Sequence, residues 1–279
     1  MVDCHTHVFP PKIGPRLAAA IGREFGREPA GDGSAADLFG HLDQAGLTRA
    51  ICFTAALRPD QMIPANSWMI ELRRTHERLI PLGTIHPEHP AWEKELDRLE
   101  RNGIHGLKIH PDLAGIPLES PVWDPLWEAA RGRFLLMMHM GPARNGGETV
   151  SRPKDLARIL DRHRNLRVVA AHMGGLGQWA ETLECLAGRD VYMDTSCCHE
   201  SISARTMGAI LDRHDHERIV FGSDYPLFAP KTERTALALL LAPLRISEEI
   251  LLRNGELLAE SLQPGGFAGP PPLPGIDFS

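Results

Sequence analysis

The stretch VDCHTHVFP at residues 2–10 decides the fold of this chain. Its apolar, β-branched start predicts a strand over residues 1–7. An open, doubly wound sheet usually carries a Gly-rich turn after its first strand, but HVFPPK stands at that position here. His5 and His7 are two residues apart, so their side chains point to the same face of the predicted strand, and in a barrel that face can be the interior. The stretch therefore favours a barrel over an open sheet.

Short apolar runs and amphipathic stretches alternate along the rest of the chain. The runs are near-continuously apolar, as expected for parallel strands that helices cover on the outside. Eight strands are predicted, at 1–7, 49–55, 79–87, 105–111, 134–141, 167–175, 190–196 and 218–226. Helices are predicted at 34–46, 65–78, 91–103, 121–133, 152–165, 177–188, 201–215, 231–243 and 247–262. Eight strands that alternate with helices predict an α/β chain folded as a single-domain (β/α)8 barrel, the TIM barrel.

Two segments lack such a pattern. Residues 8–33 form a long, irregular predicted loop after the first strand, and a loop at this position can cover a pocket at the C-terminal face of a barrel. Residues 264–279 are rich in Pro and Gly, which excludes a helix or a central strand. The predicted barrel domain therefore spans 1–263, and 264–279 is a tail.

Composition limits the partners and the compartment. The net charge is −6 and no basic stripe is present, which argues against nucleic acid and anionic membranes and leaves small molecules. There is no signal peptide and no apolar run of about 20 residues, so a cytoplasmic protein is expected. The five cysteines lack CxxC spacing and are expected to be reduced thiols. The apolar, Pro-rich tail is compatible with a homodimer.

Histidines and an aspartate stand at the C-terminal ends of several predicted strands, where a barrel keeps its active site. His139 ends the fifth strand, His172 the sixth and Asp224 the eighth. With His5 and His7 they would bring imidazoles and a carboxylate to one mouth, a donor set that suits zinc, iron or manganese but not calcium. Imidazoles clustered there without a metal or partner would each cost about 1–3 kcal/mol. We therefore predict a divalent metal site.

A second His-x-His pair shows that the spacing alone is a weak signal. His214 and His216 stand at the polar end of a predicted helix. We interpret this pair as solvent-exposed rather than as a ligand site.

Several motifs occur in a fixed order: DCHTHVFP, GLKIHP, MMHMG, AAHMGG, VYMDTS, IVFGSDYP and EEILLRNGELL. Over residues 1–262 this series resembles the amidohydrolase superfamily, in the amidohydrolase-2 branch of metal-dependent hydrolases, lactonases and non-oxidative decarboxylases. The resemblance implies a TIM barrel that binds one or two divalent metal ions, most often Zn²⁺, with Mn²⁺ or Fe²⁺ as alternatives.

The resemblance also implies a role for each matching residue. His5, His7 and His139 are metal ligands. Asp224 is a metal ligand that can also relay a proton. His172 is either a ligand of a second metal or an acid/base group that positions the reactive water.

Lys108 stands in the fourth predicted strand, in phase with His110, and three roles are open for it. In binuclear members of the superfamily a lysine of this strand can be carboxylated and bridge two metals, which would make Lys108 a metal ligand. It could instead bind a substrate carboxylate. The third role is a rim lysine whose charge reaches solvent.

Three further residues are candidate substrate-binding residues. His86 and His110 each precede a proline at a strand end and are either pocket or rim residues. Arg144 follows the fifth strand and either grips an anionic substrate with two hydrogen bonds or is a solvated loop residue.

The expected activity is metal-dependent hydrolysis of a small, anionic substrate. A metal-bound water would attack the carbonyl carbon of an amide, ester or lactone, with Asp224 or His172 moving the proton. The alternative on the same site is a lyase, either a non-oxidative decarboxylase or a hydratase. A third possibility is a non-catalytic barrel with a residual metal site, which the full set of ligands disfavours.

Overall fold

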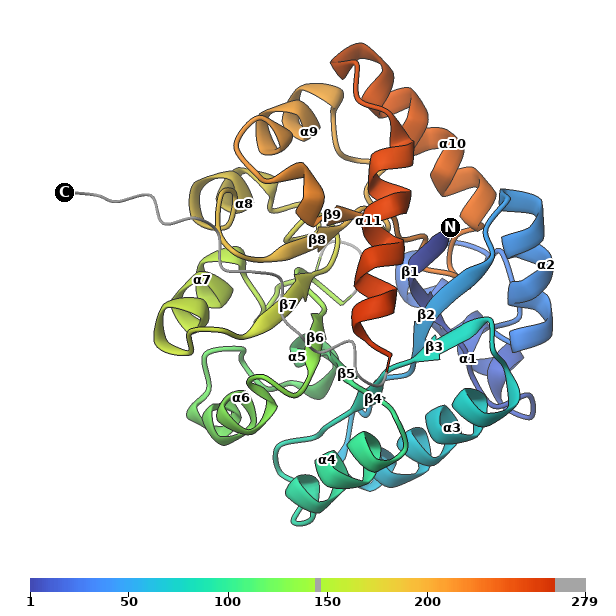
Figure 1. The fold of residues 1–279 in the computed structure, drawn as a ribbon, viewed down its shortest axis with the longest axis vertical. Helices are drawn as coiled ribbons and strands as arrows, with labels where there is room; N and C mark the ends of the chain where they lie inside the picture. Colours follow the sequence, from blue (N-terminus) through green and yellow to red (C-terminus); the bar gives the residue numbers. More distant parts are fainter. Residues whose placement is uncertain (144–146, 264–279) are drawn as a thin grey trace.

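Parallel strands alternate with helices throughout the computed structural model, which describes residues 1–143 and 147–263 (Figure 1). One sheet contains β1 (Val2–His7), β2 (Arg49–Phe53) and β3 (Leu79–Pro81), in that order. The second sheet runs in chain order through β4 (Gly83–Thr84), β5 (Gly106–Ile109), β6 (Leu135–Met138), β7 (Arg167–Ala170), β8 (Tyr192–Asp194) and β9 (Ile219–Val220).

Backbone hydrogen bonds join the two sheets at both edges. Leu82, between β3 and β4, donates to the carbonyl of Cys52 at 2.8 Å, so β3 and β4 are two halves of one strand. At the other edge Cys4 donates to Phe221 at 2.9 Å and His7 donates to Tyr225 at 2.7 Å. The predicted eight-stranded TIM barrel is confirmed.

Helices surround the strands. They are α1 (Gly14–Phe25), α2 (Ala35–Ala45), α3 (Met62–Thr75), α4 (Trp92–Arg101), α5 (Pro111–Ala114), α6 (Asp124–Ala130), α7 (Pro153–Arg162), α8 (Trp179–Cys185), α9 (Ala204–Leu211), α10 (Pro230–Leu241) and α11 (Glu248–Ser261). Short 3-10 helices are η1 (Pro59–Gln61), η2 (Pro121–Trp123), η3 (His216–Arg218) and η4 (Ala242–Leu244). In Figure 1, α11 crosses the barrel and packs on β1 and β9. Gly255 permits this contact, because a Cβ there would lie 2.8 Å from Cys4 Sγ.

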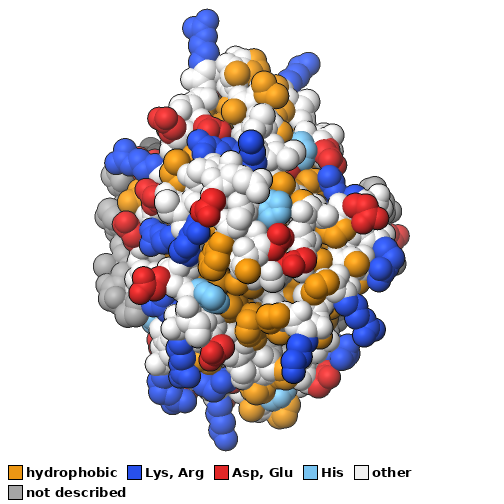
Figure 2. All heavy atoms as spheres, turned by 90° about the vertical axis from the view of Figure 1, so that its right-hand side faces the viewer, with side chains coloured by type: hydrophobic (Ala, Val, Ile, Leu, Met, Phe, Trp, Pro, Cys, Tyr) orange, Lys and Arg blue, Asp and Glu red, His pale blue; other side chains and the backbone are white. Residues whose placement is uncertain are grey.

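Apolar side chains fill the barrel and the layer outside it. Along β2, Ile51 and Phe53 belong to the inner cluster, and Ala50 and Cys52 belong to the larger cluster that also contains helix residues. This alternation is the two-residue period of a strand covered on both faces. Figure 2 shows one side of the molecule, where hydrophobic side chains reach the surface among charges of both signs. Within the described residues, no helix is long and apolar enough to cross a membrane.

A β-bulge in β1 changes which residues point inward. The pairing runs from Asp3 with Ala50 to Thr6 with Cys52, so β1 contains one residue more than β2 over this interval. Val2 and Cys4 contribute to the inner cluster below the bulge. Above it His5 and His7 take the inward positions, which gives the barrel mouth two imidazoles.

Some expectations are wrong in detail. Residues 8–33 are not irregular throughout, because α1 occupies Gly14–Phe25. The strands are shorter than predicted, and α5 begins directly after β5, at Pro111. The described cysteines are all free thiols, as expected. The predicted tail at 264–279 lies outside the described residues.

Candidate functional site

Three of the predicted ligands meet at the C-terminal end of the barrel. His5 and His7 extend from β1, and Asp224 follows β9. Asp224 Oδ1 lies 3.1 Å from His7 Nε2 and 3.4 Å from His5 Nε2. One donor atom from each residue lies within 4.8 Å of the others, a spacing that lets a single cation contact all three.

The backbone fixes the position of Asp224. Its N–H donates to the carbonyl of His5 at 2.8 Å. Its φ of +65° lies in the left-handed region, which a residue with a side chain occupies only when its surroundings hold it there. Gly222 leaves space for the neighbouring ligand, because a Cβ at this position would lie 2.7 Å from His5 Cβ. The sequence FGSD thus brings the carboxylate against β1.

His139 and His172 form a hydrogen-bonded pair at the same end of the barrel. His172 Nδ1 lies 3.1 Å from the carbonyl oxygen of Ser196, which can only accept, so we place the proton on this nitrogen. His172 Nε2 then accepts from His139 Nδ1 at 3.2 Å. This leaves a lone pair on His139 Nε2, a buried atom with no hydrogen-bond partner among the described residues.

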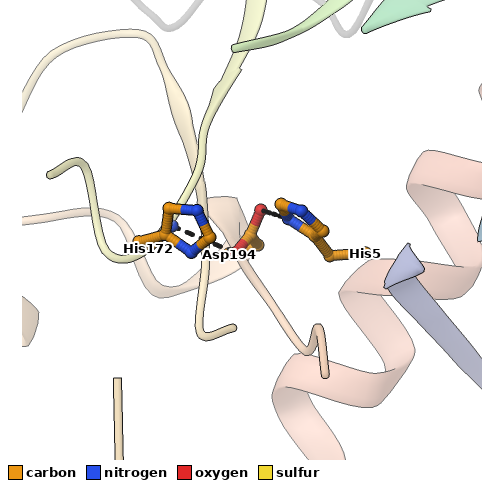
Figure 3. Close-up of side chains that lie close together, drawn as sticks. All are labelled: His5, His172 and Asp194. Atoms are coloured by element: carbon orange, nitrogen blue, oxygen red, sulfur yellow. Dashed lines mark hydrogen bonds and ion pairs between the residues drawn. The ribbon is translucent and has the colours of Figure 1, made fainter. Parts of the chain in front are cut away.

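Asp194 is a buried residue of the site that the sequence-based prediction missed. It ends β8, and its carboxylate lies between His5 and His172 (Figure 3). Oδ2 accepts from His5 Nδ1 at 2.8 Å, and Oδ1 accepts from the backbone N–H of His172 at 3.2 Å. The Ser196 hydroxyl lies 3.1 Å from His5 Nδ1 and 2.9 Å from His172 Nδ1. The signal was its place at a strand end, in VYMDTS.

The electrostatics favour the cation-binding forms of these groups. Burial, and then the charge of Lys108, lowers the pKa of His5 to about 4, so the imidazole is neutral at pH 7. Burial alone would raise the pKa of Asp224. The hydrogen bond from His7, together with the positive charges that His5 and His7 carry when protonated, outweighs burial and lowers that pKa. The pKa of Asp194 is lowered as well, because interactions led by His5 outweigh its burial. Neutral imidazoles and ionised carboxylates are the forms that bind metals.

Lys108 lies inside the barrel, not at its rim. Its side chain is buried, with Nζ 3.3 Å from His5 Nε2 and 4.5 Å from the centroid of the Phe53 ring. Burial lowers the pKa of Lys108 to about 8, against the opposing effect of Asp224 and Asp194. The rim interpretation is therefore wrong. Carboxylation and binding of a substrate carboxylate stay predictions.

A cavity of about 690 Å³ opens over these side chains. His5, His7, Lys108, His139 and Asp224 contribute its polar wall. The other lining residues are mostly apolar and come from α1, from the η1–α3 segment and from the segments after β1, β2, β5, β6 and β9. The predicted loop 8–33 therefore does contribute to a pocket, through a helix.

The candidate substrate-binding residues differ in position. His110 lines the cavity, and its ring stacks on His139 with centroids 3.8 Å apart. His86 is buried outside the cavity lining, with Nδ1 3.4 Å from the backbone N of Glu88. Arg144 lies outside the described residues. Substrate contact by these residues stays a prediction.

The other His-x-His pair has a structural role in part. His214 is buried, so the solvent-exposed interpretation is wrong for it. Its Nδ1 accepts from the N–H of Gly188 at 3.1 Å, and its Nε2 donates to the carbonyl of Val191 at 3.0 Å. His216 donates to the carbonyl of Leu211 at 2.9 Å. Both rings satisfy backbone groups, His214 just before β8 and His216 at the end of α9.

Two compact groups of possible metal-ligating atoms occur among the described residues, and both contain His5. The unpartnered Nε2 of His139 and the three-residue group of His5, His7 and Asp224 are available at the cavity. A second group, His5 with His172 and Asp194, is equally compact. Its donor atoms are already hydrogen-bonded to one another and to Ser196. The two groups differ in their access to the cavity, because His7 and Asp224 line it whereas His172 and Asp194 are absent from its described lining.

Comparison with known families identifies the chain. The family model described as amidohydrolase matches residues 2–254. The chain belongs to the amidohydrolase family. The match covers every strand of the barrel and the whole span from His5 to Asp224. It confirms the resemblance drawn from the motifs.

Solved structures similar to this amidohydrolase-family chain include both hydrolases and decarboxylases. A 5-carboxyvanillate decarboxylase from Sphingomonas paucimobilis has a TM-score of 0.68 at 16% identity, covering 91% of this chain and 97% of that one. A probable 2-pyrone-4,6-dicarboxylic acid hydrolase from Acinetobacter baumannii, with citric acid bound, has a TM-score of 0.66 at 17% identity, covering 92% and 98%. A manganese-bound 5-carboxyvanillate decarboxylase from Novosphingobium aromaticivorans has a TM-score of 0.65 at 17% identity, covering 91% and 95%. No curated protein sequence matches the chain. At these identities the similarity establishes the fold.

Proposed function

We propose that this chain is a metal-dependent hydrolase that cleaves an ester, lactone or amide bond. The proposal rests on the meeting of His5, His7 and Asp224 at the cavity, beside the unpartnered Nε2 of His139. Histidines with one carboxylate are a typical donor set for hydrolytic zinc and manganese sites. The manganese bound to one structural neighbour supports the metal site, and the similarity to a probable hydrolase supports the reaction.

The proposed cofactor is one divalent cation, Zn²⁺ in the first instance and Mn²⁺ or Fe²⁺ as alternatives. His5, His7, His139 and Asp224 would hold it. Bound there, the cation would polarise a substrate carbonyl and lower the pKa of a water molecule.

The residues of the chain would move the protons. Asp224 is ionised and lines the cavity, so it can accept a proton from the attacking water and return it to the leaving group. His172 is absent from the described lining of the cavity and hydrogen-bonds to His139. We therefore propose that His172 positions His139 instead of transferring the substrate's proton. The Lys108 ammonium can stabilise negative charge on the reacting group.

A non-oxidative decarboxylase is the second candidate. Lys108 favours it, because a buried ammonium that lines the cavity can bind the carboxylate that such a substrate carries. Two of the structural neighbours described above are decarboxylases. In this reaction a protonated group would deliver its proton to the carbon atom that carbon dioxide leaves.

Metal content per chain tests the site. Elemental analysis of protein purified without chelator should find about one transition metal ion per chain, and H5A and H139A should each lose most of it. The exposed variant D212N is the matched control and should keep it. Intact mass under non-acid conditions separates free from carboxylated Lys108. A wild-type protein that takes up neither zinc nor manganese would contradict the metal site.

Product analysis tests the reaction. The metal-loaded protein is offered aryl esters, lactones and hydroxybenzoates, with acid release and carbon dioxide release measured in parallel. Acid release without carbon dioxide, abolished in D224N, supports the hydrolase. Carbon dioxide release from the hydroxybenzoates would select the decarboxylase instead.

A further inference from the structure

Helix α1 carries an apolar stripe that the protein core covers only in part. Ile13, just before the helix, and Leu17, Ile21 and Phe25 within it recur every four residues, so they share one side. None of the four is fully buried, and Ile13 is 46% exposed. All four line the 690 Å³ cavity. Ile21 and Phe25 also pack against a small buried cluster on the cavity wall, and Ile13 and Leu17 belong to no such cluster among the described residues. The stripe therefore lines a ligand space and packs on the core at one end only.

A different side of α1 packs on the rest of the protein. Gly14, Ala18 and Gly22 are its buried residues. A Cβ at Gly22 would lie 2.5 Å from the carbonyl oxygen of Arg27 and 2.9 Å from Pro29 Cδ. The segment beyond the helix is fixed to the site, because Ala30 donates to the carbonyl of Pro226 at 2.8 Å. α1 is thus held over the cavity by backbone contacts, and its large side chains are left for the cavity.

Among the described residues, few positive charges line the cavity. Of the lysines and arginines that the structure describes, only Lys108 is among the lining residues. Trp68 adds a large aromatic surface on α3. An apolar cavity with a few convergent polar groups is the usual form of a site for a largely apolar small molecule.

Resting on the proposed function, we infer that the substrate is an amphiphile: one carboxyl or carboxyl-derived group at the polar wall, joined to an alkyl or aryl body that packs on the α1 stripe. This excludes compact dicarboxylates as good ligands. The α1 stripe, defined as Ile13, Leu17, Ile21 and Phe25, sets that preference. Moving such a body from water into the cavity supplies binding free energy in proportion to its apolar surface.

Straight-chain carboxylates are the probes that test this inference. Binding of butanoate through decanoate to the metal-loaded, full-length protein is measured by isothermal titration calorimetry. The dissociation constant should fall about fourfold per added methylene until the cavity is filled. A dicarboxylate of the same carbon number should bind at least about tenfold more weakly, because its second charge would enter an apolar space. Affinity independent of chain length, or equal binding of the dicarboxylate, would overturn the inference.

A matched pair of variants locates the effect. L17Q/I21Q should reduce the gain in affinity to about twofold or less per added methylene. Glutamine is chosen because its helix propensity is close to that of leucine. L239Q changes a leucine that is 71% exposed on α10 and should leave the gain unchanged. An unchanged gain in L17Q/I21Q would also overturn the inference.

Metal content measured on the same samples separates the two proposals. Metal binding without a chain-length effect defeats only the inferred substrate class. A chain-length effect without any metal binding would contradict the proposed enzyme. The inferred substrate class would then be wrong as well, because it rests on that enzyme, and only the apolar preference of the cavity would be supported.

Discussion

At the scale of single residues, the site depends on which nitrogen of each imidazole carries the proton. Asp194 Oδ2 accepts from His5 Nδ1, which leaves the lone pair of His5 on Nε2, the nitrogen beside Asp224 and Lys108. In D194N the other side-chain oxygen still meets the N–H groups of His172 and Ser196, so the new NH2 faces His5 Nδ1. His5 must then move its proton to Nε2. We expect D194N to bind zinc about 10–100-fold more weakly.

Competition with a chromophoric chelator measures this loss of affinity. D212N is the control, because Asp212 is an exposed aspartate on α9's C-terminal side. Circular dichroism of the metal-free proteins establishes that both variants fold. Unchanged zinc affinity in a folded D194N would show that Asp194 does not orient His5.

At the scale of elements, two glycines within helices distinguish the effect of close packing on stability from the effect of helix propensity. A methyl group at Gly22 of α1 would meet backbone and proline atoms, whereas nothing lies within 4 Å of a methyl group at Gly40 of α2. We expect G22A to lower the free energy of unfolding by about 1–3 kcal/mol through overpacking. G40A should raise it by about 0.5–1 kcal/mol, because alanine favours a helix. Urea unfolding measures both. A stabilised G22A would mean that α1 is not held closely against residues 27–29.

The same elements show what could be predicted. Strand periodicity and the convergence of strand ends were enough to select His5, His7, His139 and Asp224 before the structure was known. Helix α1 was missed because its apolar stripe faces a cavity and its packing side consists of small residues, so it lacks the usual core pattern.

The missed residues depend on pairings that a single sequence does not display. Asp194 looks like an ordinary turn residue until β8 lies beside β7 and its carboxylate reaches His5. The bulge in β1 exists only relative to the register of β2. Lys108 was placed in the correct strand, but its burial depends on the barrel interior around it.

At the scale of the whole molecule, a pair formed by the half-buried His199 and the buried Glu233 makes stability depend on pH. His199, after β8, has Nδ1 2.5 Å from Oε1 of Glu233 on α10. The hydrogen bond to Glu233 raises the pKa of His199 above its ordinary value of 6.5. Burial raises the pKa of Glu233, and His199 opposes this. Arg27 and Glu200 also face His199, with His199 Nε2 3.8 Å from Glu200.

Both shifts have the same sign for stability. A folded state with raised pKa values binds more protons than the unfolded state, so stability falls as pH rises. The contribution of His199 is complete below pH 6.5 and is lost as pH rises through its raised pKa. H199Q/E233Q removes both titrations. We therefore expect the Tm difference between wild type and H199Q/E233Q to fall between pH 6 and pH 9, by a few degrees. Differential scanning fluorimetry measures it, with the exposed α10 variant K231Q expected to follow wild type at every pH. A difference that stays constant or grows with pH would show that this pair does not hold α10 to the barrel through its charge.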